Sequence, residues 1–218
     1  MTLKDAILFR HSVRNYKSDK IEPEKIQKLN EKIIELNEEG NIHLQFIEDA
    51  GNTYNKLLNR AMGLGSAPSV IACAGPNDET LDQRIGYYGE KLVLYAQCLG
   101  LNTCWAGTFN KKNIGAEILS GERLVISIAI GYGKNSGKQR KSKKIEQVTD
   151  VHGDLPEWFK NGVEMALLAP TAINQQKFII HLNEDETVEF EDKGGVLSQV
   201  DIGIVKCHFE IGADKMIK

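Results

Sequence analysis

Two short segments at opposite ends of the sequence carry most of the groups that could bind a ligand. The first, Arg10-His11-Ser12-Val13-Arg14, places two guanidinium groups and a hydroxyl within five residues, which is chemistry suited to a phosphate. The second, residues 169–176 (Ala-Pro-Thr-Ala-Ile-Asn-Gln-Gln), offers neutral hydrogen-bonding groups and no charge, which suits a flat polar heterocycle. If the fold brings the two segments together, one chain builds one composite cofactor site.

Each of these segments also has a plain structural explanation. Basic residues at the end of a helix offset its dipole and cap its carbonyl groups. Asn174, Gln175 and Gln176 could form an ordinary polar loop between a helix and a strand. Gly107 and Thr108 present the same choice, because a glycine lets a backbone N–H approach a ligand closely or simply makes a turn. Composition alone leaves these alternatives open.

Patterns typical of catalysis by side chains are absent from the sequence. It contains no Cys-His pair, nucleophile elbow, zinc-protease helix, Walker loop or dinucleotide fingerprint. The histidines His43, His152, His181 and His208 are scattered without partner spacing, and we assign no role to His181 or His208, whose positions favour packing. We therefore expect no catalytic side chain and no metal site, and chemistry that is delegated to a cofactor.

The amino-acid composition limits which binding partners and which cellular compartment can be expected for this chain. The chain has 218 residues with 41% hydrophobic content, enough for a sizeable core, and its net charge of -3 gives no global reason to bind nucleic acid or a membrane. A nucleic-acid surface at the basic stretch 134–144 is the remaining alternative, although this stretch lacks interleaved aromatic residues. The cysteine spacing indicates buried thiols in a reducing compartment. No apolar run approaches the roughly 20 residues of a membrane span, so we expect a cytoplasmic protein.

Hydrophobic periodicity predicts the elements that would position the two segments. We expect helices from Thr2 to about His11, from Pro23 to Gly40, from about Leu81 to Leu99 and from Pro156 to before Pro170, strands at 43–48, 69–74 and 123–131, and a hairpin of 178–182 with 187–190. Residues 102–107 are expected to lead into a loop, and 134–144 to form a mobile loop. Because both polar segments follow a helix, we predict two halves, 1–150 and 151–218, around one sheet system.

Three motifs resemble those of the FMN-dependent nitroreductase family. Residues 10–14 are similar to its Arg-Arg/His-Ser-x-Arg phosphate motif, at the same place after the first helix. Residues 169–176 look like its Ala-Pro-Ser-x-x-Asn-x-Gln segment, with Thr171 in place of the usual Ser. Residues 100–107 (Gly-Leu-Asn-Thr-Cys-Trp-Ala-Gly) resemble its Gly-Leu-x-Ser/Thr-Cys-Trp stretch. The resemblance covers most of the chain and points to tandem-type members, in which one chain looks like a fused, shortened dimer.

The resemblance implies an α+β fold, a nitroreductase-like mixed-sheet sandwich flanked by helices with a pseudo-two-fold tandem in one chain. Because each motif occurs once, it implies one FMN per chain and a monomer. The implied activity is hydride transfer from NADH or NADPH through FMN to a small-molecule electron acceptor such as a nitroaromatic compound or a quinone. The alternative is a protein that binds FMN or another small molecule without turnover.

The resemblance also assigns individual residues to the two ends of the cofactor. The residues implied at the phosphate and ribityl end are Arg10, His11, Ser12 and Arg14, with Lys141 or Lys143 as further candidates. The residues implied along the isoalloxazine ring are Pro170, Thr171 and Asn174 on one side and the backbone of Ala106, Gly107 and Thr108 near flavin N5 and O4.

Overall fold

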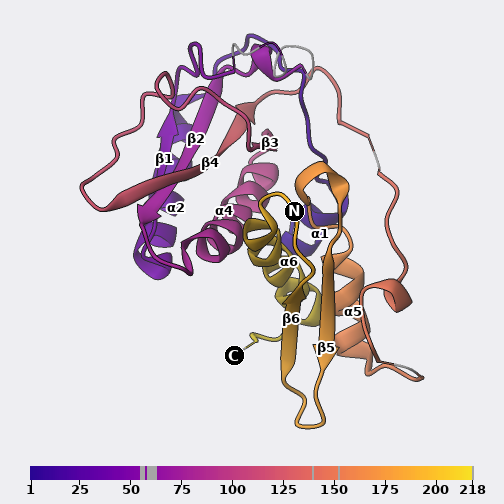
Figure 1. The fold of residues 1–218 in the computed structure, drawn as a ribbon. Coiled ribbons are helices and arrows are strands. Elements are labelled where there is room, and N and C mark those ends of the chain that lie inside the picture. The colour runs from indigo at the N-terminus through magenta and orange to yellow at the C-terminus, as the bar shows by residue number, and fades with distance from the viewer. Residues whose placement is uncertain (55–56, 58–62, 139, 152, 218) are drawn as a thin grey trace.

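The computed structural model describes residues 1–54, 57, 63–138, 140–151 and 153–217. Its larger sheet is antiparallel and has the order β1-β2-β4-β3 (Figure 1). The strands are β1 (His43–Ile47), β2 (Ser69–Pro76), β3 (Asn102–Ala106) and β4 (Glu122–Gly131). Strands β5 (Phe178–Leu182) and β6 (Val188–Asp192) form a separate antiparallel hairpin.

The fold is therefore α+β, as the sequence predicted, but the strands form two sheets and not one sheet system. The reason lies at the free edge of β3. The segment after the first helix covers that edge through a parallel bridge between Ser12 and Thr103, and Val13 N donates to Thr103 O at 3.0 Å. Residue 180 of the hairpin forms its own parallel bridge with Thr149. Each sheet thus gains a neighbour from a distant segment.

The described helices are α1 (Leu3–Phe9), α2 (Pro23–Gly40), α4 (Leu81–Cys98), α5 (Glu157–Ala166) and α6 (Ser198–Ala213). The capping box expected from Thr2 and Asp5 is present at the start of α1. Helix α6 was not predicted. It is buried around most of its circumference, so its sequence, which includes Val200, Ile202 and Ile204, lacks the polar face that marks an amphipathic helix.

The predicted strands in the larger sheet and the predicted hairpin are confirmed. Residues 102–107 lead into a loop, as expected, but 102–106 first form β3 and pair with β4. The turn signals Gly100 and Gly107 lie close to both ends of this five-residue strand and hide it in the sequence.

The four cysteines are free, and Cys98 is half-buried whereas the other three are buried. Within the described part of the chain, no helix combines the length and the apolar character needed to cross a membrane.

Helices α4 and α6 lie side by side between the larger sheet and the hairpin (Figure 1). Their backbones touch at two glycines. A Cβ atom on Gly86 would lie 2.1 Å from the carbonyl oxygen of Val200, and one on Gly203 would lie 2.0 Å from that of Gln83. Neither backbone oxygen can move away as a flexible side chain could. The close crossing therefore requires glycine at both positions.

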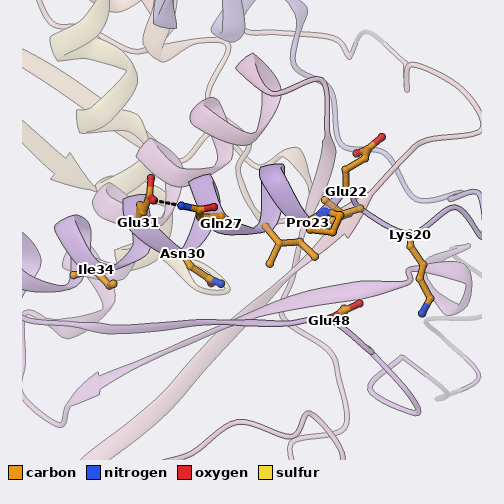
Figure 2. A pocket seen from close by; sticks show the side chains of 10 residues that line it. Lys20, Glu22, Pro23, Gln27, Asn30, Glu31, Ile34 and Glu48 are labelled. Carbon is orange, nitrogen blue, oxygen red and sulfur yellow. Dashed lines mark hydrogen bonds between the residues drawn. The ribbon is translucent and has the colours of Figure 1, made fainter.

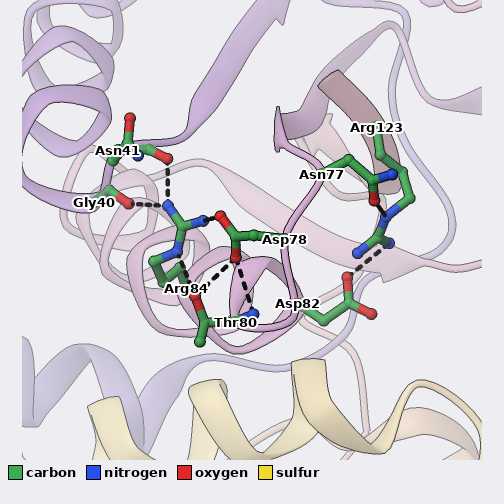
Figure 3. A network of polar contacts seen from close by, with 8 residues as sticks. All are labelled: Gly40, Asn41, Asn77, Asp78, Thr80, Asp82, Arg84 and Arg123. Atoms are coloured by element: carbon green, nitrogen blue, oxygen red, sulfur yellow. Dashed lines mark hydrogen bonds and ion pairs between the residues drawn. The ribbon is translucent and has the colours of Figure 1, made fainter. Parts of the chain in front are cut away.

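Charged residues hold the first turn of α4 in place (Figure 3). The Arg84 guanidinium donates to Gly40 O at 2.8 Å and also to Asn41 O, so it caps the end of α2. Asp78 pairs with the same guanidinium and accepts a hydrogen bond from the backbone N–H of Thr80 at 2.9 Å. Helix α4 is thus fixed at its start against α2 and in its middle against α6.

We expect Gly86→Ala and Gly203→Ala each to destabilise the fold by about 1–3 kcal/mol, because the added methyl group meets backbone and the helices must separate. This loss opposes the gain of about 1 kcal/mol that alanine brings to a helix interior. Chemical denaturation measures the effect. Asn30→Ala, at an exposed position of α2, is the control and should change stability by no more than about 0.5 kcal/mol. A stabilised glycine variant would contradict the tight crossing.

Candidate functional site

A cavity of about 870 Å³ brings the two polar segments of the sequence together. This volume lies within the range of cofactor and small-molecule sites. The residues that line it come from α1 and the segment after it, from the basic loop and from the turn at 167–174: Ile7, Leu8, Arg10, His11, Ser12, Arg14, Asn15, Asn135, Gly137, Lys138, Arg140, Ser142, Leu167, Leu168, Thr171, Ile173 and Asn174.

The first polar segment is extended and lies between the cavity and the core. Helix α1 ends at Phe9, and Arg10 has extended backbone angles. Successive side chains of an extended segment point to opposite sides. Val13 is accordingly fully buried in the core, whereas Ser12 and Arg14 line the cavity. The pairing of this segment with β3 therefore presents the cationic groups to the cavity.

Arg10 is buried, but its side chain has few polar partners within the protein. The residue is 6% exposed, and its Nε lies 3.7 Å from Oε1 of Glu90. Burial lowers the pKa of Arg10, and the charge of Glu90 opposes this shift. No residue that the structure describes accepts a hydrogen bond from its guanidinium, and Nδ1 of His11 is likewise buried without a partner. Buried donors of this kind require an acceptor.

The second polar segment is a strained turn at the other side of the cavity. Ile173 and Asn174 have φ angles of 46° and 57°, a left-handed conformation that a β-branched residue such as isoleucine rarely adopts. The side chain of Ile173 is 88% exposed and lines the cavity together with Thr171. Gln176 stabilises the turn, since its backbone N–H donates to Thr171 Oγ1 at 3.1 Å and its Nε2 to Leu167 O at 3.0 Å.

Asp201 of α6 stabilises the same turn through hydrogen bonds. Its carboxylate accepts hydrogen bonds from the backbone N–H of Ala172 at 2.9 Å and from Nε2 of Gln175 at 2.7 Å. Burial raises the pKa of Asp201 to about 6; the hydrogen bonds from Gln175 and Ala172 act against the shift, and the nearby charge of Asp192 adds to it. Sequence reasoning missed Asp201 because it lies on the helix that was not predicted.

The basic loop runs from the larger sheet toward α5 (Figure 1), and several of its residues line the cavity. It is irregular, as expected, but residues 140–143 are hydrogen-bonded to residues 167–176 and not free. Lys143 Nζ donates to Gln176 O at 2.6 Å, and Asn174 Nδ2 donates to Lys141 O at 2.9 Å. Neither Lys141 nor Lys143 is among the residues that line the cavity.

Lys138 and Arg140 line the cavity instead. Arg140 Nη2 donates to Leu168 O at 2.7 Å and also to Ala169 O, just after the end of α5. Burial lowers the pKa of Arg140 to about 10, and the nearby charge of Arg10 lowers it further. Positions 138, 140 and 142 face the cavity whereas 141 and 143 do not, which is the alternation of an extended chain. The sequence carries no local signal that sets Arg140 apart from its basic neighbours.

The remaining candidate residues lie outside the cavity lining. Ala106 is buried at the end of β3, and a Cβ atom on Gly107 would lie 2.6 Å from a methyl group of Leu197. Thr108 is exposed, and Pro170 is buried behind the turn. The structure thus brings Arg10, His11, Ser12, Arg14, Thr171 and Asn174 together around the cavity, and the lining does not include Ala106, Gly107, Thr108, Lys141, Lys143 or Pro170.

A second hollow of about 750 Å³ runs along α2 (Figure 2). Its charged side chains are Lys20 and three carboxylates, Glu22, Glu31 and Glu48. Figure 2 shows Gln27 occupied by a hydrogen bond to Glu31, at 2.9 Å. An excess of negative charge does not suit an anionic cofactor, so this hollow is not the candidate site.

Comparison with known proteins identifies the family of this chain. A family model described as "Putative TM nitroreductase" matches residues 2–213. The chain belongs to this nitroreductase family. It is accordingly an oxidoreductase of the nitroreductase type. None of the curated proteins compared matches the chain.

Solved structures of this fold type extend the comparison. A "putative nitroreductase" from Thermotoga maritima is 22% identical, with a TM-score of 0.70, over 97% of this chain and 83% of that one. A "putative nitroreductase in complex with FMN" from Exiguobacterium sibiricum is 16% identical, with a TM-score of 0.57, over 70% and 98%. A "putative NADH oxidase" from Clostridium acetobutylicum is 26% identical, with a TM-score of 0.51, over 65% and 96%. These likenesses support the fold.

The raised pKa of Asp201 predicts how stability depends on pH. Because the pKa of Asp201 is about 6 in the folded state and about 3.9 for an unfolded Asp, the folded protein binds the proton more tightly. Lowering the pH from 7 to 5 should therefore stabilise the wild type relative to Asp201→Asn by about 1 kcal/mol. Chemical denaturation at both pH values measures the difference.

The control for this experiment is Asp19→Asn, which changes an exposed carboxylate and should show a wild-type-minus-variant difference that is constant over the same pH range. A constant difference for Asp201→Asn as well would show that burial does not shift this carboxyl group.

Proposed function

We propose that the cavity binds FMN and that the protein transfers hydride from NADH or NADPH to a small-molecule electron acceptor. One observation carries this proposal: Arg10 is buried and lines the cavity, and its Nε has no hydrogen-bond partner among the described residues. Three further cations, Arg14, Lys138 and Arg140, line the same cavity, and no carboxylate is found among the described side chains that line it. This combination fits a phosphate group.

The phosphate end of FMN would lie at the first polar segment. Arg10 and Arg14 can each present two parallel N–H groups to phosphate oxygens. Within the described part of the chain, Arg14 makes neither a hydrogen bond nor an ion pair, and the Nδ1 atom of His11 is also available. Arg140 adds charge from the basic loop, while its contacts with the end of α5 hold it in place.

The ring end of FMN would lie between α1 and the turn. The aliphatic side chains that line the cavity provide an apolar surface for a flat aromatic system, and they are Ile7, Leu8, Leu167, Leu168 and Ile173. Thr171 and Asn174 supply the few polar groups that such a ring needs at its edge. The residues present therefore fit FMN at both ends.

When bound, FMN would supply the hydride acceptor and donor of the reaction. The residues of this chain would position the cofactor and the two substrates and exclude water from the cavity. The proposed acceptors are nitroaromatic compounds and quinones. The solved structures described above as an FMN complex and as an NADH oxidase support this choice of cofactor and reductant. The alternative is a protein that binds FMN without turnover.

We also propose that one chain completes the site, with residues 1–150 and 151–218 as two halves of a monomer. Arg10 and Thr171 come from opposite ends of the sequence and line the same cavity, so no second subunit is needed to join the two polar segments.

Arg14→Ala should weaken FMN binding by roughly tenfold or more, because it removes a charged donor to phosphate, and it should leave the fold intact because Arg14 is exposed. The fluorescence of FMN during titration of the apoprotein measures the affinity. Lys17→Ala removes the charge of an exposed lysine outside the cavity lining and serves as the matched control. Equal affinities in the two variants would contradict the assignment of Arg14 to the phosphate.

Anaerobic addition of NADH or NADPH to the FMN-loaded protein should bleach the flavin absorbance near 450 nm, and a quinone or nitroarene added afterwards should restore it. FMN that binds but is not bleached would favour the alternative without turnover. A protein that binds no FMN would overturn the proposed function.

A further inference from the structure

Glu90 is a completely buried carboxylate with partners from three separate segments. Its Oε2 accepts a hydrogen bond from Trp105 Nε1 of β3 at 2.7 Å. Its Oε1 lies 2.8 Å from Nε2 of His208 on α6 and 3.7 Å from Nε of Arg10. Glu90 and His208 are both fully buried. A buried charge is retained only where its partners offset the cost of removing it from water.

The crossing of α4 and α6 brings these groups together. Glu90 is one helical turn after Gly86, and His208 follows Gly203 on the facing helix. Gly89 leaves room for the indole ring, since a Cβ atom there would lie 2.5 Å from Trp105. The carboxylate therefore lies 3.7 Å from Arg10 Nε, and Glu90 is not among the residues that line the cavity.

The hydrogen-bond partners determine how many protons this cluster holds. Nδ1 of His208 lies 3.1 Å from Met165 O, and a carbonyl oxygen only accepts, so Nδ1 carries a hydrogen. The contact between His208 Nε2 and Glu90 Oε1 then needs one more proton, because an unprotonated nitrogen and a carboxylate would repel each other. Wherever that proton lies, the charges of Glu90 and His208 sum to zero, and Arg10 keeps its full positive charge.

We propose that His208 neutralises Glu90 so that the charge of Arg10 remains available to the phosphate of the cofactor. The two residues are thus positioning residues for Arg10, and this inference rests on the proposed binding of FMN. Without His208, an ionised Glu90 at 3.7 Å would compete with the phosphate for the same guanidinium. With His208, the carboxylate lies beside Arg10 without cancelling its charge.

A double-mutant cycle separates this charge balance from a merely structural role. His208→Asn removes the neutralising group and should weaken FMN binding by roughly tenfold or more. Glu90→Gln should bind FMN within about threefold of the wild type, because the charge at Arg10 is unchanged and the amide can still meet Trp105 and His208. Combining the two substitutions should restore most of the affinity that His208→Asn loses.

The measurement is fluorescence titration of each folded apoprotein with FMN and with riboflavin, which lacks the phosphate. The account predicts that the rescue appears with FMN and that riboflavin affinities stay nearly equal across the variants. A double variant weaker than both single variants, or equal losses for FMN and riboflavin, would overturn the inference.

A variant that does not fold and a wild type that binds no FMN are interpreted separately. If circular dichroism shows that His208→Asn does not fold, His208→Gln replaces it in the cycle, and a loss of more than tenfold for Glu90→Gln alone would also overturn the inference. If the wild type binds no FMN, the proposed function fails. If the wild type binds FMN and the double variant shows no rescue, only the role of Glu90 and His208 fails.

Discussion

The close crossing of α4 and α6 is the contact on which the arrangement of the molecule depends. Gly86 and Gly203 let the two backbones touch, and each helix carries a polar group that contacts residues of the cavity lining or of its turn. Helix α4 supplies Glu90, which lies beside Arg10, and α6 supplies His208 and Asp201. A wider crossing would separate Glu90 from His208 and move Asp201 away from the turn at 172–175. Packing between two helices therefore sets the geometry of polar groups that come from both ends of the chain.

The two sides of the cavity are fixed by different physical means. On the cationic side, the segment 10–14 is held by pairing with the edge of β3 and by Val13 in the core. On the neutral side, a turn with left-handed residues is held by Asp201 and Gln176. The basic loop connects the two sides because Arg140 reaches the end of α5. Such preorganisation lowers the entropy that a ligand loses on binding.

Much of this structure could be predicted from the sequence, because the deciding signals were local. The capping box at Thr2, the proline at the start of α2 and the alternation in 43–48 each predicted the element that is present. Helix α6 could not be predicted in this way, and neither could the bounds of strand β3. The first is buried on most sides and has no amphipathic period, and the second is too short and too closely flanked by glycines. Whether these residues form a helix or a strand depends on how they pack in the folded protein.

The residues of the candidate site likewise fall into two groups, those that could be predicted from the sequence and those that could not. The residues of the motifs 10–14 and 169–176 could be found because their types and order are unusual, and several of them line one cavity. Arg140, Asp201 and Glu90 could not, because their importance comes from partners distant in sequence.

A crystal structure with bound FMN is the most direct test of the proposed site. The account predicts phosphate oxygens within about 3 Å of the Arg10 guanidinium and the ring against Thr171 and Ile173. A phosphate bound by Lys141 and Lys143, away from Arg10, would contradict it.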